Sequence, residues 1–177
     1  MGRGELLIRD AVVEDMAAVR DIYNALVPST TVAWTEVPET LRQRQAWFRH
    51  HVRDGYPVLV AVDGSGEVIG FAAYGSFRGA GRWPGYRHTV EHTIHVREDR
   101  WGLGAGRRLL EELIVRARAA GMHVLVGAVD GANDASLRFH ERLGFVEVAR
   151  MPEVGRKFDR WLDLVLVQLV LDDAVGP

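Results

Sequence analysis

Apolar and polar positions follow two different periods along the chain, and together they predict a protein with both helices and strands. Apolar residues recur three and four positions apart over 14–26, the spacing of an amphipathic helix. A second helix is expected over 38–55, because Pro38 can open a helix and Gly55 can end one. The run at 58–77 holds two apolar stretches around a glycine-rich turn, which predicts a β-hairpin.

The second half of the chain continues this alternation of strands and helices. Residues 88–96 are rich in β-branched side chains, as strands are. Leucines at helical spacing from Leu109 onward predict a helix that ends at Gly121. The remaining expected elements are a first strand at 5–11, strands at 123–129, 145–151 and 161–171, and a helix at 133–143.

The order of these elements predicts the class of fold. Hairpins and crossover helices both occur, so we expect an α/β protein whose mixed, mostly antiparallel sheet is flanked by about four helices. A doubly wound nucleotide fold would need regular strand–helix alternation, which is absent. The length of 177 residues fits one domain over 1–177, with a core at about 5–170.

Composition excludes several classes of function. Lys and Arg total 22 against 24 Asp and Glu, giving a net charge of -2, so neither nucleic acid nor a membrane surface is expected as a partner. The chain has no cysteine, which excludes disulfides, thiolate nucleophiles and cysteine-ligated metals. No signal peptide and no apolar run of ~18 residues is evident, which favours a cytoplasmic protein.

A glycine cluster lies between an expected strand and an expected helix. Gly102, Gly104 and Gly106 leave the backbone N–H groups at the helix start open, and such a terminus suits a phosphate. Arg107 adds positive charge beside it. A plain turn before a helix is the alternative. The segment matches neither a P-loop, which needs Gly-Lys-Ser/Thr, nor the dinucleotide pattern G-x-G-x-x-G.

The glycine segment forms a wider pattern with a helix further along the chain. "IHVREDRWGLGAGRRLLEEL" followed by "NDASLRFHERLGF" resembles the Gcn5-related N-acetyltransferase (GNAT) superfamily, which binds acetyl-coenzyme A. With "YRHTVEHTIHV" and "KFDRWLDLVLVQL" added, the chain is similar to the phosphinothricin and methionine sulfoximine acetyltransferase branch. That resemblance implies a small amine acceptor that carries a carboxylate, and a homodimer.

The resemblance also implies which residues bind the acetyl-coenzyme A. The strand end would pair with the pantetheine arm, the glycine loop would bind the pyrophosphate, and the later helix would hydrogen-bond the pantetheine. Trp101 departs from the superfamily, which has Arg or Gln at that position. The implied residues are His95, Val96, Trp101, Gly102, Leu103, Gly104, Ala105, Gly106, Arg107, Asn133 and Ser136. For Asn133, a helix N-cap is the alternative role.

Acetyl transfer to an amine needs a group that accepts a proton and a group that protonates the departing thiolate. Glu91 stands in an apolar, β-branched run, where burial would raise its pKa and make it a better base. The resemblance places the general base at this position and a His acid at His140. The alternatives are a Glu91 that faces solvent or pairs with an Arg, and a surface His140.

A carboxylate acceptor needs a planar donor such as Arg. Arg78 and Arg87 lie with Tyr86 in an aromatic loop just before the strand of Glu91, and predict an anion clamp. The alternative is a solvated basic loop. Trp34 is a candidate pocket wall, although a single Trp is more often part of a core.

No metal site is expected. His92 and His95 are three positions apart on a strand and therefore lie on opposite faces, which prevents them from sharing a metal ion.

The predicted function is N-acetylation of a small amino acid or analogue by acetyl-coenzyme A. Two alternatives remain open at this level: acetylation of a protein N-terminus or lysine, and a non-catalytic acyl-coenzyme A-binding module.

Overall fold

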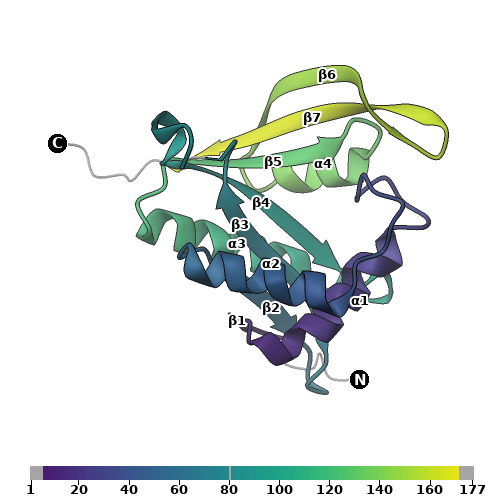
Figure 1. Ribbon diagram of the computed structural model, residues 1–177, viewed down its shortest axis with the longest axis vertical. Coiled ribbons are helices and arrows are strands. Elements are labelled where there is room, and N and C mark those ends of the chain that lie inside the picture. The colour runs from purple at the N-terminus through teal and green to yellow at the C-terminus, as the bar shows by residue number, and fades with distance from the viewer. Residues whose placement is uncertain (1–5, 80, 172–177) are drawn as a thin grey trace. The chain divides into compact units, whose positions relative to one another are not determined.

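The computed structural model describes residues 6–79 and 81–171 (Figure 1). Its strands are β1 (Leu7–Asp10), β2 (Val58–Val62), β3 (Val68–Ser76), β4 (Thr89–Val96), β5 (Val124–Asp130), β6 (Val146–Lys157) and β7 (Arg160–Val170). Its α-helices are α1 (Met16–Leu26), α2 (Leu41–Arg53), α3 (Ala105–Ala119) and α4 (Asp134–Glu141). Three short 3-10 helices are η1 (Val13–Asp15), η2 (Pro84–Tyr86) and η3 (Glu98–Arg100). Within these described residues, no helix has both the length and the apolar character needed to cross a membrane.

The strands form a seven-stranded sheet in the order β1-β2-β3-β4-β5-β7-β6. β1 pairs antiparallel with β2, and β2 antiparallel with β3. β4 and β5 run parallel, whereas β7 is antiparallel to both β5 and β6. The expected mixed, mostly antiparallel α/β fold is therefore confirmed.

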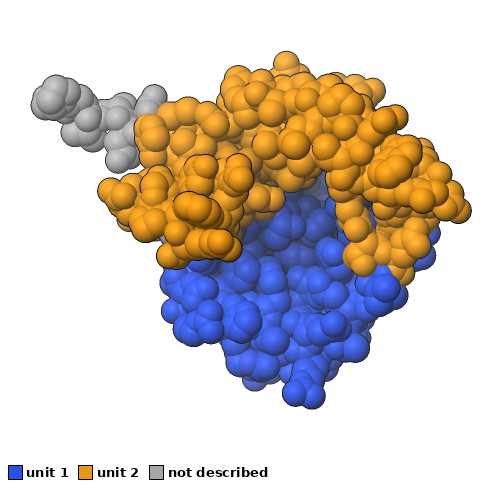
Figure 2. All heavy atoms as spheres, turned by 45° about the horizontal axis from the view of Figure 1, so that its top comes forward, with its two compact units in different colours: residues 1–33, 37–74, 93–113 blue, residues 34–36, 75–92, 114–177 orange. Residues whose placement is uncertain are grey.

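The chain divides into two compact units, which Figure 2 colours separately. Unit 1 comprises residues 1–33, 37–74 and 93–113, and unit 2 comprises residues 34–36, 75–92 and 114–177. β4 contributes its first half to unit 2 and its second half to unit 1. A single domain over the whole chain stays a prediction.

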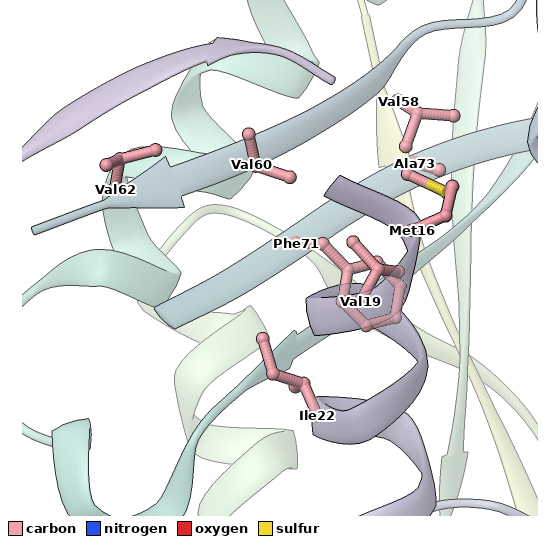
Figure 3. Packing of buried hydrophobic residues seen from close by; sticks show 8 residues of the cluster. All are labelled: Met16, Val19, Ile22, Val58, Val60, Val62, Phe71 and Ala73. Carbon is pink, nitrogen blue, oxygen red and sulfur yellow. The ribbon is translucent and has the colours of Figure 1, made fainter. Parts of the chain in front are cut away.

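The core of unit 1 lies between α1 and strands β2 and β3, and Figure 3 shows the side chains pointing toward one another. The cluster comprises Met16, Val19, Ile22, Val58, Val60, Val62, Phe71 and Ala73. The three helix residues are those that the sequence places at helical spacing. α2 adds partly buried residues to the same cluster, among them Trp47 and Phe48. Burial of this one stripe explains why α1 is stable as a short helix.

α2 begins at a capping box that the sequence pattern left unrecognised. The Thr40 hydroxyl accepts a hydrogen bond from the Gln43 backbone N–H at 3.3 Å. In return, the Gln43 side chain accepts one from the Thr40 backbone N–H at 2.8 Å. The reciprocal pair satisfies two donors that the helix start would otherwise leave open, so the helix starts at Leu41.

In unit 1, the first half of α3 packs on β3 at Gly70, a position without a side chain. A Cβ at Gly70 would lie 3.0 Å from the His95 carbonyl oxygen and 3.3 Å from a Leu109 methyl group. The neighbouring Phe71 belongs to the α1 cluster. Because successive strand residues point to opposite faces, α1 and α3 cover opposite faces of β3.

In unit 2, α3 ends where the sequence predicts. Gly121 has a φ of 70° and donates its N–H to Arg118 at 2.9 Å, while Met122 donates to Ala117 at 3.0 Å. A left-handed residue at this position satisfies the last carbonyls of a helix, and glycine adopts it without strain.

β6 differs most from the sequence prediction, which ended that strand at residue 151. The strand continues to Lys157, although its register against β7 shifts between Glu147 and Ala149 and again between Met151 and Gly155. The second irregularity contains Pro152, which cannot donate a hydrogen bond to the neighbouring strand. A proline that indicates a strand end in the sequence therefore lies inside a longer strand.

Candidate functional site

The predicted site residues divide between the two units. Unit 1 holds the implied strand end and glycine loop, with His95, Val96 and residues 101–107. Unit 2 holds the remaining predicted residues, which are Trp34, Arg78, Tyr86, Arg87, Glu91, Asn133, Ser136 and His140.

The glycine loop of unit 1 forms a turn that opens directly into α3. Gly102 and Gly104 have φ of 76° and 88°, values that side chains with a Cβ rarely adopt. The Gly104 carbonyl accepts the first helical hydrogen bond, from Arg108 N–H at 3.1 Å. The N–H groups of Ala105, Gly106 and Arg107 lie in the first turn of α3, where a helix provides no acceptor for them. The loop is thus a turn with open donors.

The space outside the glycine loop is open. A Cβ built at Gly102 or Gly104 would meet no atom within 4 Å. Leu103 is exposed, whereas Ala105 is buried, so the loop packs on one side and is open on the other. An open helix N-terminus of this kind suits a phosphate group.

The arginines near the loop already have partners. Arg107 forms an ion pair with Glu111 at 2.7 Å, and Arg108 donates to the Leu6 carbonyl at 2.5 Å. Arg100 lies 3.2 Å from Asp63. Because the Arg107–Glu111 pair is exposed, solvent screens it and it can be exchanged for a ligand contact.

Trp101 has a definable structural role. Its indole Nε1 donates a hydrogen bond to the Val96 carbonyl at 2.8 Å, while its ring is 56% exposed. The residue therefore ties the start of the glycine loop to the end of β4. Relative to an Arg or Gln at this position, Trp101 keeps an N–H donor, and relative to an Arg it lacks a positive charge.

A hollow of about 690 Å³ lies in unit 1 beside the end of β4. α1 supplies one wall, and Val68 and residues 96–99 supply the other. Its volume falls within the range of small-molecule sites. The lining residues are Ala18, Asp21, Ile22, Ala25, Leu26, Ser29, Thr30, Val68, Val96, Arg97, Glu98 and Asp99.

The His95 side chain is buried in the structure. Its ring packs edge-on against Tyr23, with 5.6 Å between centroids, and is tilted against Phe71, with 5.2 Å between centroids. Its Nε2 lies 2.9 Å from the Thr93 hydroxyl. Burial and the nearby Arg44 charge lower the pKa of His95 to about 4, so the ring is neutral. Any contact with a ligand at this residue must come from its backbone.

In unit 2, Glu91 is exposed on β4 and forms no ion pair with any described residue. The alternative in which Glu91 faces solvent is therefore borne out, whereas a Glu–Arg pair is not seen within residues 6–79 and 81–171. Partial burial raises the pKa of this carboxyl above its ordinary value. The rise is limited by the solvent that still reaches the side chain. Glu91 is thus an unpaired carboxylate that binds a proton more readily than an ordinary Glu.

His140 is buried with 3% of its surface exposed, so the alternative of a surface histidine is wrong. Its ring stacks on His92 at 5.1 Å and meets Phe145 edge-on at 5.3 Å. Its Nδ1 lies 2.7 Å from the Ser136 carbonyl oxygen. Since a carbonyl only accepts, Nδ1 carries the proton. Burial lowers the pKa of His140, which leaves a neutral ring.

The other ring nitrogen of His140, Nε2, has no hydrogen-bond partner among the described residues. The atom is buried. Gly127 on β5 adjoins it, because a Cβ there would lie 3.5 Å from Nε2. With the proton on Nδ1, Nε2 is a lone-pair acceptor, so His140 must first take up a proton before it can act as an acid.

Asn133 caps α4. Its side-chain oxygen accepts the Ser136 backbone N–H at 3.0 Å, which confirms the N-cap alternative. The amide NH2 of Asn133 takes no part in that cap and is a donor. The Ser136 hydroxyl lies 3.4 Å from His140 Nδ1, so both Asn133 and Ser136 help to position α4 and its histidine.

The aromatic loop exposes both candidate arginines. The Arg78 guanidinium lies 5.8 Å from the Tyr86 ring centroid, and Arg87 donates to the Pro84 carbonyl at 3.3 Å. Neither arginine forms an ion pair with a described residue. Phe77 supports Tyr86 edge-on at 5.6 Å. Two exposed guanidinium groups in one loop, neither of them in an ion pair with a described residue, are suited to a carboxylate.

Sequence reasoning missed three residues near the end of β6 that lie close to the segment Trp34–Glu36. Gly155, Lys157 and Phe158 all approach the segment that begins at Trp34, and Lys157 is only 2% exposed. The motif "KFDRWLDLVLVQL" contains two of them, but nothing in its pattern indicates that they meet a tryptophan. No group of three potential metal ligands occurs in the part of the chain that the structure describes.

Comparison with known proteins agrees with this geometry. The acetyltransferase (GNAT) family model matches residues 19–145. The chain is 52% identical over 165 residues to the L-methionine sulfoximine/L-methionine sulfone acetyltransferase of Pseudomonas paraeruginosa, covering 93% of this chain and 94% of the relative. It is 45% identical over 170 residues to the L-amino acid N-acyltransferase MnaT of Escherichia coli, covering 96% of each.

A solved structure gives the same result at the level of the fold. The GNAT superfamily phosphinothricin acetyltransferase of Sinorhizobium meliloti, solved in complex with AcCoA, has a TM-score of 0.90 and 33% identity, over 97% of this chain and 92% of that chain. The protein therefore belongs to the acetyltransferase (GNAT) family. The resemblance that the sequence motifs indicated is confirmed.

Proposed function

We propose that this protein transfers the acetyl group of acetyl-coenzyme A to the α-amino group of a small amino acid or analogue of the methionine sulfone, methionine sulfoximine or phosphinothricin type. The observation that carries the proposal is Glu91, an unpaired carboxylate with a raised pKa on the strand that leads to the glycine loop. Relatives with these printed activities, one of them 52% identical, support the choice of acceptor.

The glycine loop is the proposed site for the coenzyme pyrophosphate. Gly102 and Gly104 turn the chain directly into the first N–H groups of α3, and a Cβ added at either glycine would meet no atom within 4 Å. Backbone donors and the helix dipole then supply the binding that an arginine gives in other phosphate sites. Asn133 offers its amide NH2 to the pantetheine chain, because only its oxygen is used by the cap.

Acetyl-coenzyme A supplies the acetyl group as a thioester. Attack by the neutral amine forms a C–N bond and breaks the C–S bond, which releases one proton from nitrogen and leaves a thiolate. Glu91 accepts the amine proton, directly or through water. His140 is neutral with a free lone pair on Nε2, so it carries a proton to the thiolate only after taking one up.

The acceptor carboxylate is assigned to Arg78 and Arg87, which are exposed and form no ion pair with a described residue. A guanidinium can hold a carboxylate through two parallel hydrogen bonds. The acidic groove expected for a basic peptide acceptor is not what this loop offers, which favours a small acid over a protein substrate.

The decisive experiment measures thiol release from acetyl-coenzyme A with and without methionine sulfone. We expect release only with the amino acid, and Glu91→Gln should lower kcat by about 100-fold, the usual weight of general base catalysis. His140→Gln should also lower kcat, with little change in acetyl-coenzyme A affinity. If the protein binds the coenzyme but releases no thiol with any amino acid, it is a binding module instead. An unchanged kcat in Glu91→Gln removes that residue from the mechanism.

The protein is further proposed to be a homodimer in the cytoplasm. β6 and β7 carry several large apolar side chains in contact with solvent, which a second copy would cover. They are Val146, Val148, Met151, Val154, Trp161 and Val170. Acetyl-coenzyme A is an intracellular metabolite, which supports the location. Sedimentation velocity and cell fractionation test the two points, and a monomer at micromolar concentration would refute the dimer.

A further inference from the structure

A short segment of the chain, Trp34–Glu36, lies against the far end of β6 within unit 2. A Cβ built at Gly155 would lie 2.2 and 2.3 Å from two carbon atoms of the six-membered ring of Trp34, far inside van der Waals contact. Gly155 does not have a positive φ, so the glycine is required by space and not by backbone conformation. The indole ring therefore rests directly on the strand backbone, and any larger residue at 155 must displace it.

A second contact fixes the same segment two residues further on. The Glu36 carboxylate accepts a hydrogen bond from the Phe158 backbone N–H at 3.0 Å. Burial lowers the pKa of Lys157, and the Glu36 charge offsets part of that shift. The Lys157 ammonium lies 4.7 Å from the Phe158 ring centroid. The segment is thus held at Trp34 by shape and at Glu36 by a charge-assisted hydrogen bond.

The turn that provides this hydrogen bond is itself strained. Lys157 pairs with Arg160 across the hairpin, so Phe158 and Asp159 form a two-residue turn at the end of β6 and β7 (Figure 1). Both have positive φ, 51° and 58°. Turns of this kind favour Asn-Gly, because a residue with a Cβ is disfavoured in the left-handed region. Strain of this sort persists where the surrounding structure requires it, and is common at functional sites.

One part of Trp34 remains free. Although Gly155 covers one side of the ring, the residue is still 36% exposed. An aromatic face attracts groups with partial positive charge. Methyl groups attached to a sulfonyl, sulfoximine or phosphinyl centre carry such charge, because the oxidised sulfur or phosphorus withdraws electrons. The proposed acceptors share that group.

We propose that Gly155, Glu36 and the turn at 157–160 are positioning residues that hold the Trp34 ring as the wall against the acceptor side chain, and that this ring selects acceptors with a methyl group on an oxidised sulfur or phosphorus. The inference rests on the proposed function and adds the determinant of acceptor choice. Gly155 and Glu36 act through Trp34, and only Trp34 touches the acceptor.

A double-mutant cycle tests the pathway. Trp34→Ala and Gly155→Ala are each expected to raise the KM for methionine sulfone by about tenfold, the weight of one aromatic contact, and to leave the KM for acetyl-coenzyme A unchanged. In the double variant, Gly155→Ala should add nothing further, since the ring that it displaces is gone. Effects that multiply to about a hundredfold would overturn the proposal, as would an equal rise in both KM values.

The Glu36 contact has its own conservative test. Glu36→Gln keeps an oxygen that can accept the Phe158 N–H, whereas Glu36→Ala removes it. We expect Gln to retain most of the wild-type KM and Ala to raise it severalfold, with kcat little changed. Glu14→Ala is the matched control, because Glu14 is an exposed carboxylate outside unit 2. Equal effects of Glu36→Ala and Glu14→Ala would contradict the assigned role.

Selectivity and ring position are separate readouts. The preference for methionine sulfone over norleucine, which lacks the sulfonyl group, should fall in both Trp34→Ala and Gly155→Ala. In protein labelled with 5-fluorotryptophan, the fluorine signal of Trp34, assigned by its loss in Trp34→Phe, should move in Gly155→Ala without any ligand. If the wild type is active but neither Trp34→Ala nor Gly155→Ala changes the preference for methionine sulfone over norleucine, only this inference is refuted. A wild type that acetylates no amino acid refutes the proposed function as well.

Discussion

The buried imidazole of His95 makes the stability of unit 1 depend on pH. The ring is 9% exposed, lies between Tyr23 and Phe71, and is near the charged Arg44. Burial and then the Arg44 charge lower its pKa from 6.5 to about 4. The unfolded chain therefore binds a proton at a pH where the folded protein does not, and acid favours unfolding.

The size of the effect follows from the two pKa values. Their difference is 6.5 minus 4, about 2.5 units, and each unit corresponds to about 1.36 kcal/mol. His95 thus contributes about 3 kcal/mol of pH-dependent stability. The contribution is complete above pH 6.5, decreases by about 1.4 kcal/mol per pH unit below it, and is lost as the pH falls through 4.

Urea denaturation at pH 7.5, 6.5, 5.5 and 4.5 measures this contribution. Other groups titrate over the same range, so the quantity of interest is the difference in slope between wild type and variants without the imidazole. His95→Phe and His95→Gln should both be less stable than wild type at pH 7.5, because packing or the Thr93 contact is lost. Between pH 6.5 and 4.5, each should lose about 2 kcal/mol less than wild type, because at pH 6.5 the imidazole of the unfolded chain is only half protonated. Parallel pH profiles for wild type and both variants would refute the reasoning.

Two further predictions concern the ligands. Gly104→Ala places a Cβ in open space but at a φ of 88°, so we expect the free energy of unfolding to fall by about 1–2 kcal/mol and the Tm to fall by a few degrees. In steady-state kinetics, the KM for acetyl-coenzyme A should rise while the KM for the amino acid does not. Equal changes in the two KM values would contradict the phosphate assignment. Arg87→Ala removes a charged hydrogen-bond donor worth about 1.5–3 kcal/mol, so the KM for methionine sulfone should rise about 10- to 100-fold with the KM for acetyl-coenzyme A unchanged. Arg118→Ala, an exposed arginine on α3, is the control, and a similar response in both variants would disprove the clamp.

The order of helices and strands could be predicted because it follows from local patterns. The apolar spacing that predicts α1 is also the spacing of its buried residues, from Met16 to Leu26. Gly121 ends α3 as expected, because a helix end depends on the conformation of one residue and its immediate neighbours. The glycine turn before α3 is local for the same reason.

The candidate site was predictable in its residue types but not in their surroundings. Glu91 and His140 were both expected as proton carriers, yet one is exposed and unpaired whereas the other is buried and neutral. The difference arises because His92 and Phe145 cover His140 from other elements of unit 2. Periodicity along one helix cannot indicate what packs on it.

The sequence by itself determined the family, the element order and the glycine turn, since motifs, breakers and apolar periods act over a few neighbouring residues. Only the tertiary structure decided that β6 continues past Pro152, because β7 supplies the pairing and irregular register absorbs the interruption. It also decided that Glu36 meets Phe158, 122 positions away. Contacts of that kind depend on the packing of distant segments, and burial sets the charge of groups such as His95 and His140 only once those segments are in place.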